Sequence, residues 1–371
     1  MKVPLLDVNA QNLPLQDRFA QKFREIVSSG IFILGPEVEA FEREVAAECG
    51  AEHGIGVSSG TDALVVALMT AGVGPGDEVI CPAFTFFATA GSVERLGAMP
   101  VFVDVLPDTF NIDVVKMEEK ITERTAAIIP VHLFGQSADM AAVMEVASRH
   151  NLTVIEDVAQ AIGAKCGERG CGSIGDFGTF SFYPTKNLGG VGEGGMVTTN
   201  DEGLAARARA IRNHGMVERY RHDMIGGNFR LDAIQAGMLR IKLEQLEGYA
   251  GARRANAARY QKQFADISEL TLPQEGEGLF HTWNQFTVRV AGGKRDELRA
   301  TLAAADIGSE IYYPITLDQQ PCFKDLPPHA LGGIEVAHQL ARECLSLPVY
   351  PELAVVQQDA VIAAVRGFFH S

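Results

Sequence analysis

Short apolar segments alternate with helical patterns from about residue 36 to residue 200, and this alternation constrains the fold more than any other feature of the chain. The segments with strand character are GIGV, EVICP, PVFVDV, AAIIPVHL and TVIEDV. Between them lie stretches such as TDALVVALMTAGV and DMAAVMEVASRH, whose apolar residues recur at helical spacing. Strands that are apolar throughout are typical of a parallel sheet with helices on both faces. The sequence therefore predicts an α/β domain with a mostly parallel central sheet.

The pattern changes after residue 240. The elements predicted there are a long polar-faced helix over 241–264, a strand over 281–290, a helix over 294–306, a strand over 310–314 and two closing helices. Helices and strands alternate less regularly in this part, which is typical of a smaller α+β domain. We predict a large domain over residues 1–248, including an N-terminal helical segment, and a small C-terminal domain over 249–371.

The composition narrows the class of protein. The chain has 371 residues, 47% of them hydrophobic and 21% charged, which is enough apolar material for a large buried core. Its formal net charge is −15, so binding to nucleic acid or to an anionic membrane is not expected. No apolar run reaches the ~18 residues that a membrane span needs, and the N-terminus lacks the apolar stretch of a signal peptide. We expect a cytoplasmic protein whose six cysteines are reduced.

A strand runs directly into a helix in GIGVSSGTDALVVALM, and the joint carries an anion-binding pattern. Gly60 allows a ligand to approach the backbone closely. The amides of Gly60, Thr61 and Asp62 begin the helix, so their free N–H groups and the helix dipole favour a phosphate. The alternative is that Ser59 or Thr61 only caps the helix, and the motif alone does not decide between the two.

Asp157 and Lys186 point most sharply to a chemistry. Asp157 ends an apolar strand, where a carboxylate needs a partner; a pyridinium nitrogen would supply it, and a cap on the following turn is the structural alternative. Lys186 follows a strand that ends at Pro184 and precedes the glycine-rich stretch 189–195, which leaves room for a bulky ligand. A lysine in such a place is usually a solvated surface residue. Together with Asp157 it predicts Schiff-base binding of pyridoxal phosphate (PLP).

Two other patterns are given no function. The run from Gly170 to Gly175 fits G-x-G-x-x-G, but a strand rather than a helix is predicted after it, so it fails the test for a dinucleotide site. Cys166 and Cys171 have no second pair of cysteines or histidines at ligand spacing. We therefore expect no metal site.

Six motifs occur in a highly specific order and spacing, namely SSGTDAL, CPAFTFFATA, VHLFGQSADM, VIEDVAQAIGA, GTFSFYPTKNLGG and GGNFRLDAIQA. Together they resemble the DegT/DnrJ/EryC1/StrS family of sugar aminotransferases, from LGPEVEAFE to YYPITLDQQP. The resemblance implies a PLP-dependent enzyme with the aspartate aminotransferase type of fold (PLP fold type I). Such enzymes usually move an amino group from L-glutamate to a keto sugar on a nucleotide diphosphate. The amino sugars commonly enter surface polysaccharides or glycosylated natural products.

The resemblance also implies roles for individual residues. Lys186 would form the Schiff base and shuttle a proton, and Asp157 would bind the pyridine nitrogen. The other cofactor contacts would be Gln160 near the ring hydroxyl, Phe86 on the ring face, Gly60, Thr61 and Ser181 around the phosphate, and Asn228 of a neighbouring subunit at the same phosphate. Each active site would then be built by two chains of a homodimer.

The candidates for the sugar substrate are less specific. Arg219 and Arg221 are cations that suit a diphosphate, although ordinary surface charge explains them equally well. His132 ends a strand and is a candidate for the pocket, with a buried structural histidine as the alternative. Tyr313 and Gln319 lie where relatives often read YPxPLHxQ; here Asp318 replaces the histidine, yet the segment favours members that aminate the C3 position.

Two other functions stay open on these residues. Lys186 and Asp157 would also support a PLP-dependent dehydratase or lyase acting on a similar sugar. Some members of the family were described as regulators, so a regulatory protein of the same fold is the second alternative. Lysine at the Schiff-base position favours transamination, because the members that dehydrate use a histidine there.

Overall fold

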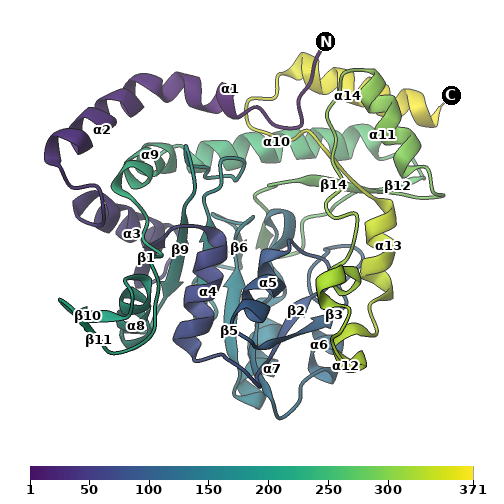
Figure 1. Ribbon diagram of the computed structural model, residues 1–371. Helices are drawn as coiled ribbons and strands as arrows, with labels where there is room; N and C mark the ends of the chain where they lie inside the picture. Colours follow the sequence, from purple (N-terminus) through teal and green to yellow (C-terminus); the bar gives the residue numbers. More distant parts are fainter. Residues whose placement is uncertain (371) are drawn as a thin grey trace.

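The computed structural model describes residues 1–370 (Figure 1). At its centre is a seven-stranded sheet with the order β1–β9–β8–β5–β4–β2–β3. These strands are β1 (His53–Val57), β2 (Glu78–Pro82), β3 (Met99–Val103), β4 (Thr125–Ile128), β5 (Thr153–Asp157), β8 (Phe177–Ser181) and β9 (Gly195–Thr199). Within this sheet only β9 runs antiparallel to its neighbours, so the predicted α/β fold with a mostly parallel sheet is confirmed.

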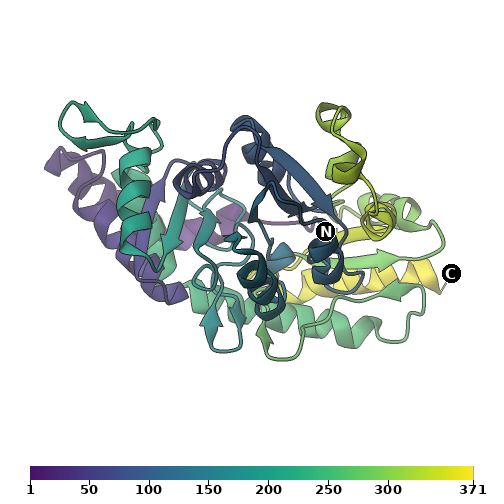
Figure 2. The ribbon, with the colours of Figure 1, turned by 90° about the horizontal axis from the view of Figure 1, so that it is seen from below.

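Helices cover both faces of the central sheet. One face carries α4 (Gly60–Ala71), α5 (Ala88–Arg95) and α8 (Glu202–Arg212), and α4 packs against β5, β8 and β9. The other face carries α3 (Pro36–Cys49) and α7 (Met140–His150), so the view in Figure 2 shows the sheet between two helical layers. Strand side chains alternate between the layers: Ile155 of β5 lies in the core beneath α4, and Val154 lies in the core beneath α7.

The remaining helices lie at the ends of the chain and around the central sheet. They are α1 (Val8–Asn12), α2 (Gln16–Ser29), α6 (Val114–Glu119), α9 (Ala233–Leu243), α10 (Leu246–Phe264), α11 (Arg295–Ala304), α12 (Pro328–Leu331), α13 (Glu335–Glu343) and α14 (Val355–Phe369). Short 3₁₀ turns are η1 (Leu13–Leu15), η2 (Leu133–Gly135), η3 (Leu317–Gln319) and η4 (Pro321–Phe323). No helix within residues 1–370 is long and apolar enough to cross a membrane.

Three small sheets complete the structure. The C-terminal part holds an antiparallel sheet of β12 (Leu270–Thr271), β14 (Phe286–Val290) and β15 (Cys344–Leu347). A second sheet joins β13 (Leu279–Phe280), β6 (Lys165–Cys166) and β7 (Arg169–Gly170), and a hairpin is formed by β10 (Met216–Glu218) and β11 (Arg221–His222). The N-terminus returns to the C-terminal part, where Val3 pairs with Ile307. The division at residue 248 stays a prediction.

Two predicted elements are wrong. The helix predicted over 241–264 is divided into α9 and α10 at Glu244 and Gln245, because α9 packs against α2 and α3 whereas α10 packs against α14. The strand predicted over 310–314 is only a single bridge between Glu310 and Ser346, and the tyrosines that follow turn toward a cavity. Pairing with β14 is instead provided by β15, which the sequence analysis missed.

Candidate active site

A cavity of about 680 Å³ opens at the carboxyl ends of the central strands. Its wall includes Asp157 at the end of β5, Ser181 at the end of β8 and Gly60 at the start of α4. The C-terminal part of the chain contributes Asn284 and Tyr313. The carboxyl ends of parallel strands meet at one edge of a sheet, which is where open α/β sheets bind ligands.

Asp157 is 5% exposed, and its carboxylate accepts two hydrogen bonds. Thr89 Oγ1 of α5 donates to Oδ2 at 2.9 Å, and the Ala159 amide donates to Oδ1 at 3.1 Å. Burial raises the pKa of Asp157, and these hydrogen bonds together with the charge of Lys186 oppose that rise. A buried carboxylate of this kind favours a positively charged group in the cavity.

Lys186 lies on the loop after β8, where its amide donates to the Tyr183 carbonyl at 2.9 Å. Its half-buried side chain lines the cavity. Burial lowers the pKa of the Lys186 ammonium group, and the charge of Asp157 opposes that change. A lower pKa leaves a larger fraction of the amine unprotonated near neutral pH, as a nucleophilic lysine requires.

The start of α4 forms a cup whose free amides could bind an anion. Ser59 caps the helix, since its Oγ accepts a hydrogen bond from the Asp62 amide at 3.1 Å. The amides of Gly60 and Thr61 occupy the first helical positions and therefore have no intrahelical acceptor. Ser181 stands against them, because a Cβ added to Gly60 would lie 2.5 Å from the Ser181 Cβ. The capping and anion-binding interpretations of this motif thus hold together.

Three further side chains surround the space for a flat ligand. Gln160 accepts a hydrogen bond from the Phe134 amide at 2.8 Å and donates through Nε2 to the Tyr313 hydroxyl at 3.0 Å. The Phe86 ring is 57% exposed, and its centre lies 6.4 Å from that of Tyr313. All three line the same cavity as Asp157 and Lys186, so an aromatic face, an amide and a carboxylate surround one amine.

The model of the DegT/DnrJ/EryC1/StrS aminotransferase family matches residues 14–366. The chain belongs to this family. A "Pleiotropic regulatory protein" of Geobacillus stearothermophilus is 47% identical over 371 residues, which cover 100% of this chain and 99% of the relative. A UDP-N-acetyl-3-dehydro-alpha-D-glucosamine 3-aminotransferase of Acidithiobacillus ferrooxidans is 44% identical over 368 residues, which cover 99% and 98% of the two chains.

Solved structures agree with this assignment. The crystal structure of S. venezuelae DesV in complex with a ketimine intermediate matches with a TM-score of 0.96 and 42% identity, covering 100% of this chain and 99% of that one. The structural neighbours are PLP-dependent aminotransferases, which confirms the fold type expected from the resemblance. The chain is therefore an enzyme of the aminotransferase class.

The aminotransferase places several predicted substrate residues outside the cavity of its own chain. His132 does not line the cavity; it is fully buried and hydrogen-bonded to Glu156, so the alternative of a buried structural histidine describes its position. Gln319 lies exposed in η3 and does not line the cavity. His132 was a candidate because it ends a strand, and Gln319 because of the family resemblance; neither signal specifies where the side chain points.

The predicted residues Arg219, Arg221 and Asn228 are also absent from this cavity wall. Arg219 lies over the Tyr220 ring at 5.1 Å, and Arg221 pairs with Asp223 at 2.9 Å on the exposed β10–β11 hairpin. Asn228 is exposed on the segment that returns from this hairpin. In Figure 1 the hairpin projects from the end of the aminotransferase that carries β1 and α8. Any role at an active site would therefore be at that of another subunit.

The sequence analysis missed other residues of the cavity wall, namely Thr85, Tyr183, Thr185, Glu193, Asn284 and Tyr312. Proximity to Phe86 and Lys186 is a sequence signal for the first three of them. Glu193 stands alone as a charged residue in the glycine-rich stretch 189–195, which is also a usable signal. Asn284 lies in a segment that was interpreted as a strand, and no signal in the sequence places it beside Lys186.

Proposed function

We propose that this aminotransferase uses PLP to transfer the amino group of L-glutamate to a nucleotide-linked 3-keto sugar. The observation that carries the proposal is the cavity that brings Lys186, Asp157 and the cup at the start of α4 together. These residues fit PLP: free amides and a hydroxyl suit its phosphate, the buried carboxylate suits its protonated ring nitrogen, and Lys186 suits its aldehyde. The amino sugar would serve a surface polysaccharide or a glycosylated natural product.

Each of these residues has a separate task. Gly60, Thr61 and Ser181 would hold the phosphate of PLP, Phe86 would cover a face of its ring, and Gln160 would lie near its hydroxyl group. Asp157 would keep the ring nitrogen protonated, and bound PLP would supply an electron sink. Lys186 Nζ, once free, would take a proton from the α-carbon of the amino donor and hold it for return.

The nucleotide sugar requires cations that one chain does not place in the cavity. The charged residues of the cavity wall are Asp157, Lys186 and Glu193, and only one of these is a cation. The exposed hairpin with Arg219 and Arg221, and the nearby Asn228, suit a shared site in a homodimer, where they meet the diphosphate and the cofactor phosphate of the partner chain. The names of relatives that act on 3-keto or 3-amino sugars support the C3 position.

The visible absorbance spectrum of the protein with PLP, before and after L-glutamate, tests this proposal. A Schiff-base band should appear, bleach with glutamate, and map to Lys186 after borohydride trapping and peptide analysis. Nucleoside-diphosphate-linked 3-keto sugars based on dTDP and UDP should then restore the band, with one 2-oxoglutarate formed for each amino sugar. A dehydratase would need no stoichiometric donor, and a regulator would show no turnover; either result contradicts the proposal.

A further inference from the structure

The run from Gly170 to Gly175, which fits the dinucleotide motif, binds the carboxylate of Glu156 through its backbone amides. Glu156 is fully buried, and three backbone amides donate to its carboxylate: Gly172 at 2.9 Å, Ile174 at 2.7 Å and Gly175 at 2.8 Å. Gly172 has a φ of 93°, and a Cβ there would lie 2.4 Å from the Phe180 ring. The turn is therefore built so that its amides converge on Glu156.

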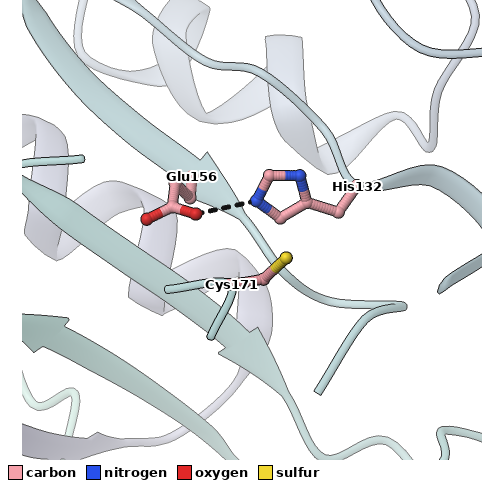
Figure 3. Close-up of side chains that lie close together, drawn as sticks. All are labelled: His132, Glu156 and Cys171. Atoms are coloured by element: carbon pink, nitrogen blue, oxygen red, sulfur yellow. Dashed lines mark hydrogen bonds and ion pairs between the residues drawn. The ribbon is translucent and has the colours of Figure 1, made fainter. Parts of the chain in front are cut away.

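His132 supplies the fourth hydrogen bond to this carboxylate. Its Nε2 lies 2.9 Å from Glu156 Oε2, as Figure 3 shows. On the other side of the ring, Nδ1 accepts a hydrogen bond from the Ala138 amide at 3.1 Å. Because Nδ1 accepts from the Ala138 amide, the ring proton that faces Glu156 is on Nε2 and is donated to the carboxylate. Burial opposes a charged ring, but Cys171 and Glu156 beside it raise the pKa of His132. Burial opposes ionisation of Glu156, but His132 and the amides lower its pKa, so the carboxylate stays charged.

A metal ion is not needed to explain this cluster. His132, Glu156 and Cys171 offer donor atoms within 4.8 Å of one another, and all three side chains are buried (Figure 3). Both histidine nitrogens and both oxygens of Glu156 are already engaged in hydrogen bonds. A metal would have to break the bond between His132 and Glu156, which the surrounding amides favour.

The same cluster is joined to Asp157 through the backbone. The Asp157 amide donates to the Pro130 carbonyl at 2.9 Å, and the His132 amide donates to the Asp157 carbonyl at 3.0 Å. His132 is therefore hydrogen-bonded to Asp157 through its backbone and to Glu156 through its ring. Neighbouring strand residues point to opposite faces, so the carboxylate of Asp157 faces the cavity while that of Glu156 faces the glycine-rich turn.

We propose that the bond from His132 to Glu156 makes both of them positioning residues for Asp157. The hydrogen bonds from His132 to the adjacent residues Glu156 and Asp157 fix the orientation of the end of β5. They also keep a second negative charge behind the carboxylate that meets the ring nitrogen of PLP, which favours the protonated ring. This inference rests on the proposed function, and neither residue contacts the cofactor.

Two variants of His132 separate this role from a structural one. His132→Asn keeps an acceptor where Nδ1 accepts from Ala138 but loses the donor to Glu156. His132→Gln does the reverse, since its amide nitrogen reaches the place of Nε2. Each variant thus removes one hydrogen bond, and only His132→Asn removes the one that our inference uses. The measurements are the Kd of PLP from absorbance, the pH midpoint of the Schiff-base band, and the Tm of the protein without PLP.

We expect His132→Asn to raise the Kd of PLP by about tenfold, because Asp157 is then held less firmly toward the ring nitrogen. The pH midpoint of the band should also rise, because a less positive ring lets the Schiff base keep its proton to higher pH. His132→Gln should leave both values near those of the wild type, even where the two variants lower the Tm equally.

Equal values for His132→Asn and the wild type would overturn the inference and leave the proposed function intact. Equal losses of PLP affinity in His132→Asn and His132→Gln would also overturn it, since that result indicates that His132 has a packing role alone. A wild-type protein that forms no Schiff-base band would overturn the proposed function and, with it, this inference.

Discussion

At the residue scale, Lys186 and Asp157 are ionisable groups whose charged forms are disfavoured by burial. Burial lowers the pKa of Lys186 and raises that of Asp157, and each charge partly offsets the shift of the other. The structure without cofactor therefore carries a cost for two buried charges that a Schiff base and a pyridinium nitrogen would remove. Because binding of PLP would remove this cost, the cost adds to the affinity of the site for PLP.

Replacement of Lys186 by methionine should stabilise the protein without PLP. The folded pKa of Lys186 is lowered, so the cost of its charge is complete at pH values below that pKa. Above it the folded state loses the proton first, and the cost disappears as the pH approaches the unfolded value of about 10.5. Urea unfolding at pH 7 to 10 should thus show a gain for Lys186→Met that shrinks with pH. A gain independent of pH would contradict the electrostatic origin.

Asp157→Asn tests the electron sink. The amide keeps the shape of the carboxylate and an acceptor for the Ala159 N–H, but it carries no charge for the ring nitrogen. We expect PLP still to bind and kcat to fall by ~10²–10³-fold, which is the usual cost of losing one aimed electrostatic contact. The rate at which glutamate bleaches the Schiff-base band in a single turnover measures the proton-transfer step. Thr89→Val is the milder control, because it removes the bond to Oδ2 and the hydroxyl contact with Thr85 but keeps the charge of Asp157.

At the element scale, the start of α4 combines a structural cap with a ligand site. Ser59 turns its hydroxyl inward to the Asp62 amide, while the amides of Gly60 and Thr61 point along the helix axis toward the cavity. Ser181 at the end of β8 is held against Gly60 because the two elements pack closely. One turn of the chain thus serves both folding and binding, and substitutions can separate the two.

Ser59→Ala and Gly60→Ala should affect different properties, the first the stability of the protein and the second its affinity for PLP. Loss of the cap should lower the free energy of unfolding by about 1 kcal/mol, while the affinity for PLP stays nearly constant. A methyl group at Gly60 would lie 2.5 Å from the Ser181 Cβ and 3.0 Å from its Oγ, so Ser181 and the end of β8 would have to shift away from the cup. The Kd of PLP should then rise by about tenfold, or roughly 1.4 kcal/mol. Urea unfolding and absorbance titration report the two effects, and a large loss of PLP affinity in Ser59→Ala would contradict this division.

At the scale of the whole molecule, the β10–β11 hairpin is separate from the cavity of its own chain. It exposes the apolar side chains of Val217, Tyr220 and Ile225 together with its arginines, and Tyr220 is 80% exposed. Exposed apolar groups beside charged ones are typical of a surface that meets another protein. A second copy of the chain, with an anion-binding cavity short of cations, is the partner that our proposed function implies.

Mixing two inactive variants tests whether two chains share each site. Lys186→Ala fails at its own site, and Asn228→Ala fails at the site of the partner. In a hybrid of the two, one site has both defects and the other has none, so random reassociation should restore about a quarter of the wild-type activity. A mixture of Lys186→Ala and Asp157→Asn is the matched control, because both defects lie in the same chain's site and no activity should return.

The large domain was predictable because its signals are local. Apolar strands such as EVICP and TVIED occur where β2 and β5 lie, and Pro36 and Gly50 bound α3 as helix-start and helix-stop residues do. The C-terminal part was predicted less well. The break between α9 and α10 depends on which helices each one packs against, and the loss of the strand at 310–314 depends on Tyr313 reaching Gln160.

The cofactor side of the candidate site was also largely predictable from sequence. Lys186, Asp157, Gly60 and Ser181 belong to motifs whose residue types suit PLP chemistry, and the structure brings them to one cavity. The substrate side was less predictable. His132 was a candidate because it ends a strand, with a buried structural histidine as the alternative, and Gln319 because of the family resemblance; neither signal specifies where a side chain points. Asn284 shows the same limit: its amide donates to Asn187 Oδ1 at 3.0 Å, a contact between residues 97 positions apart.

The sequence by itself determined the α/β architecture, the family and the pair of residues proposed to carry the chemistry, because strand and helix periods and short motifs are encoded by neighbouring residues. Only the tertiary structure decided how buried polar groups are paired. Glu156 and Asp157 are adjacent and alike in sequence, but the alternation of β5 turns one toward the cavity and the other toward the glycine-rich turn. That difference in direction gives the two carboxylates separate surroundings, and the packing of β5 in the sheet decides which of them faces the cavity.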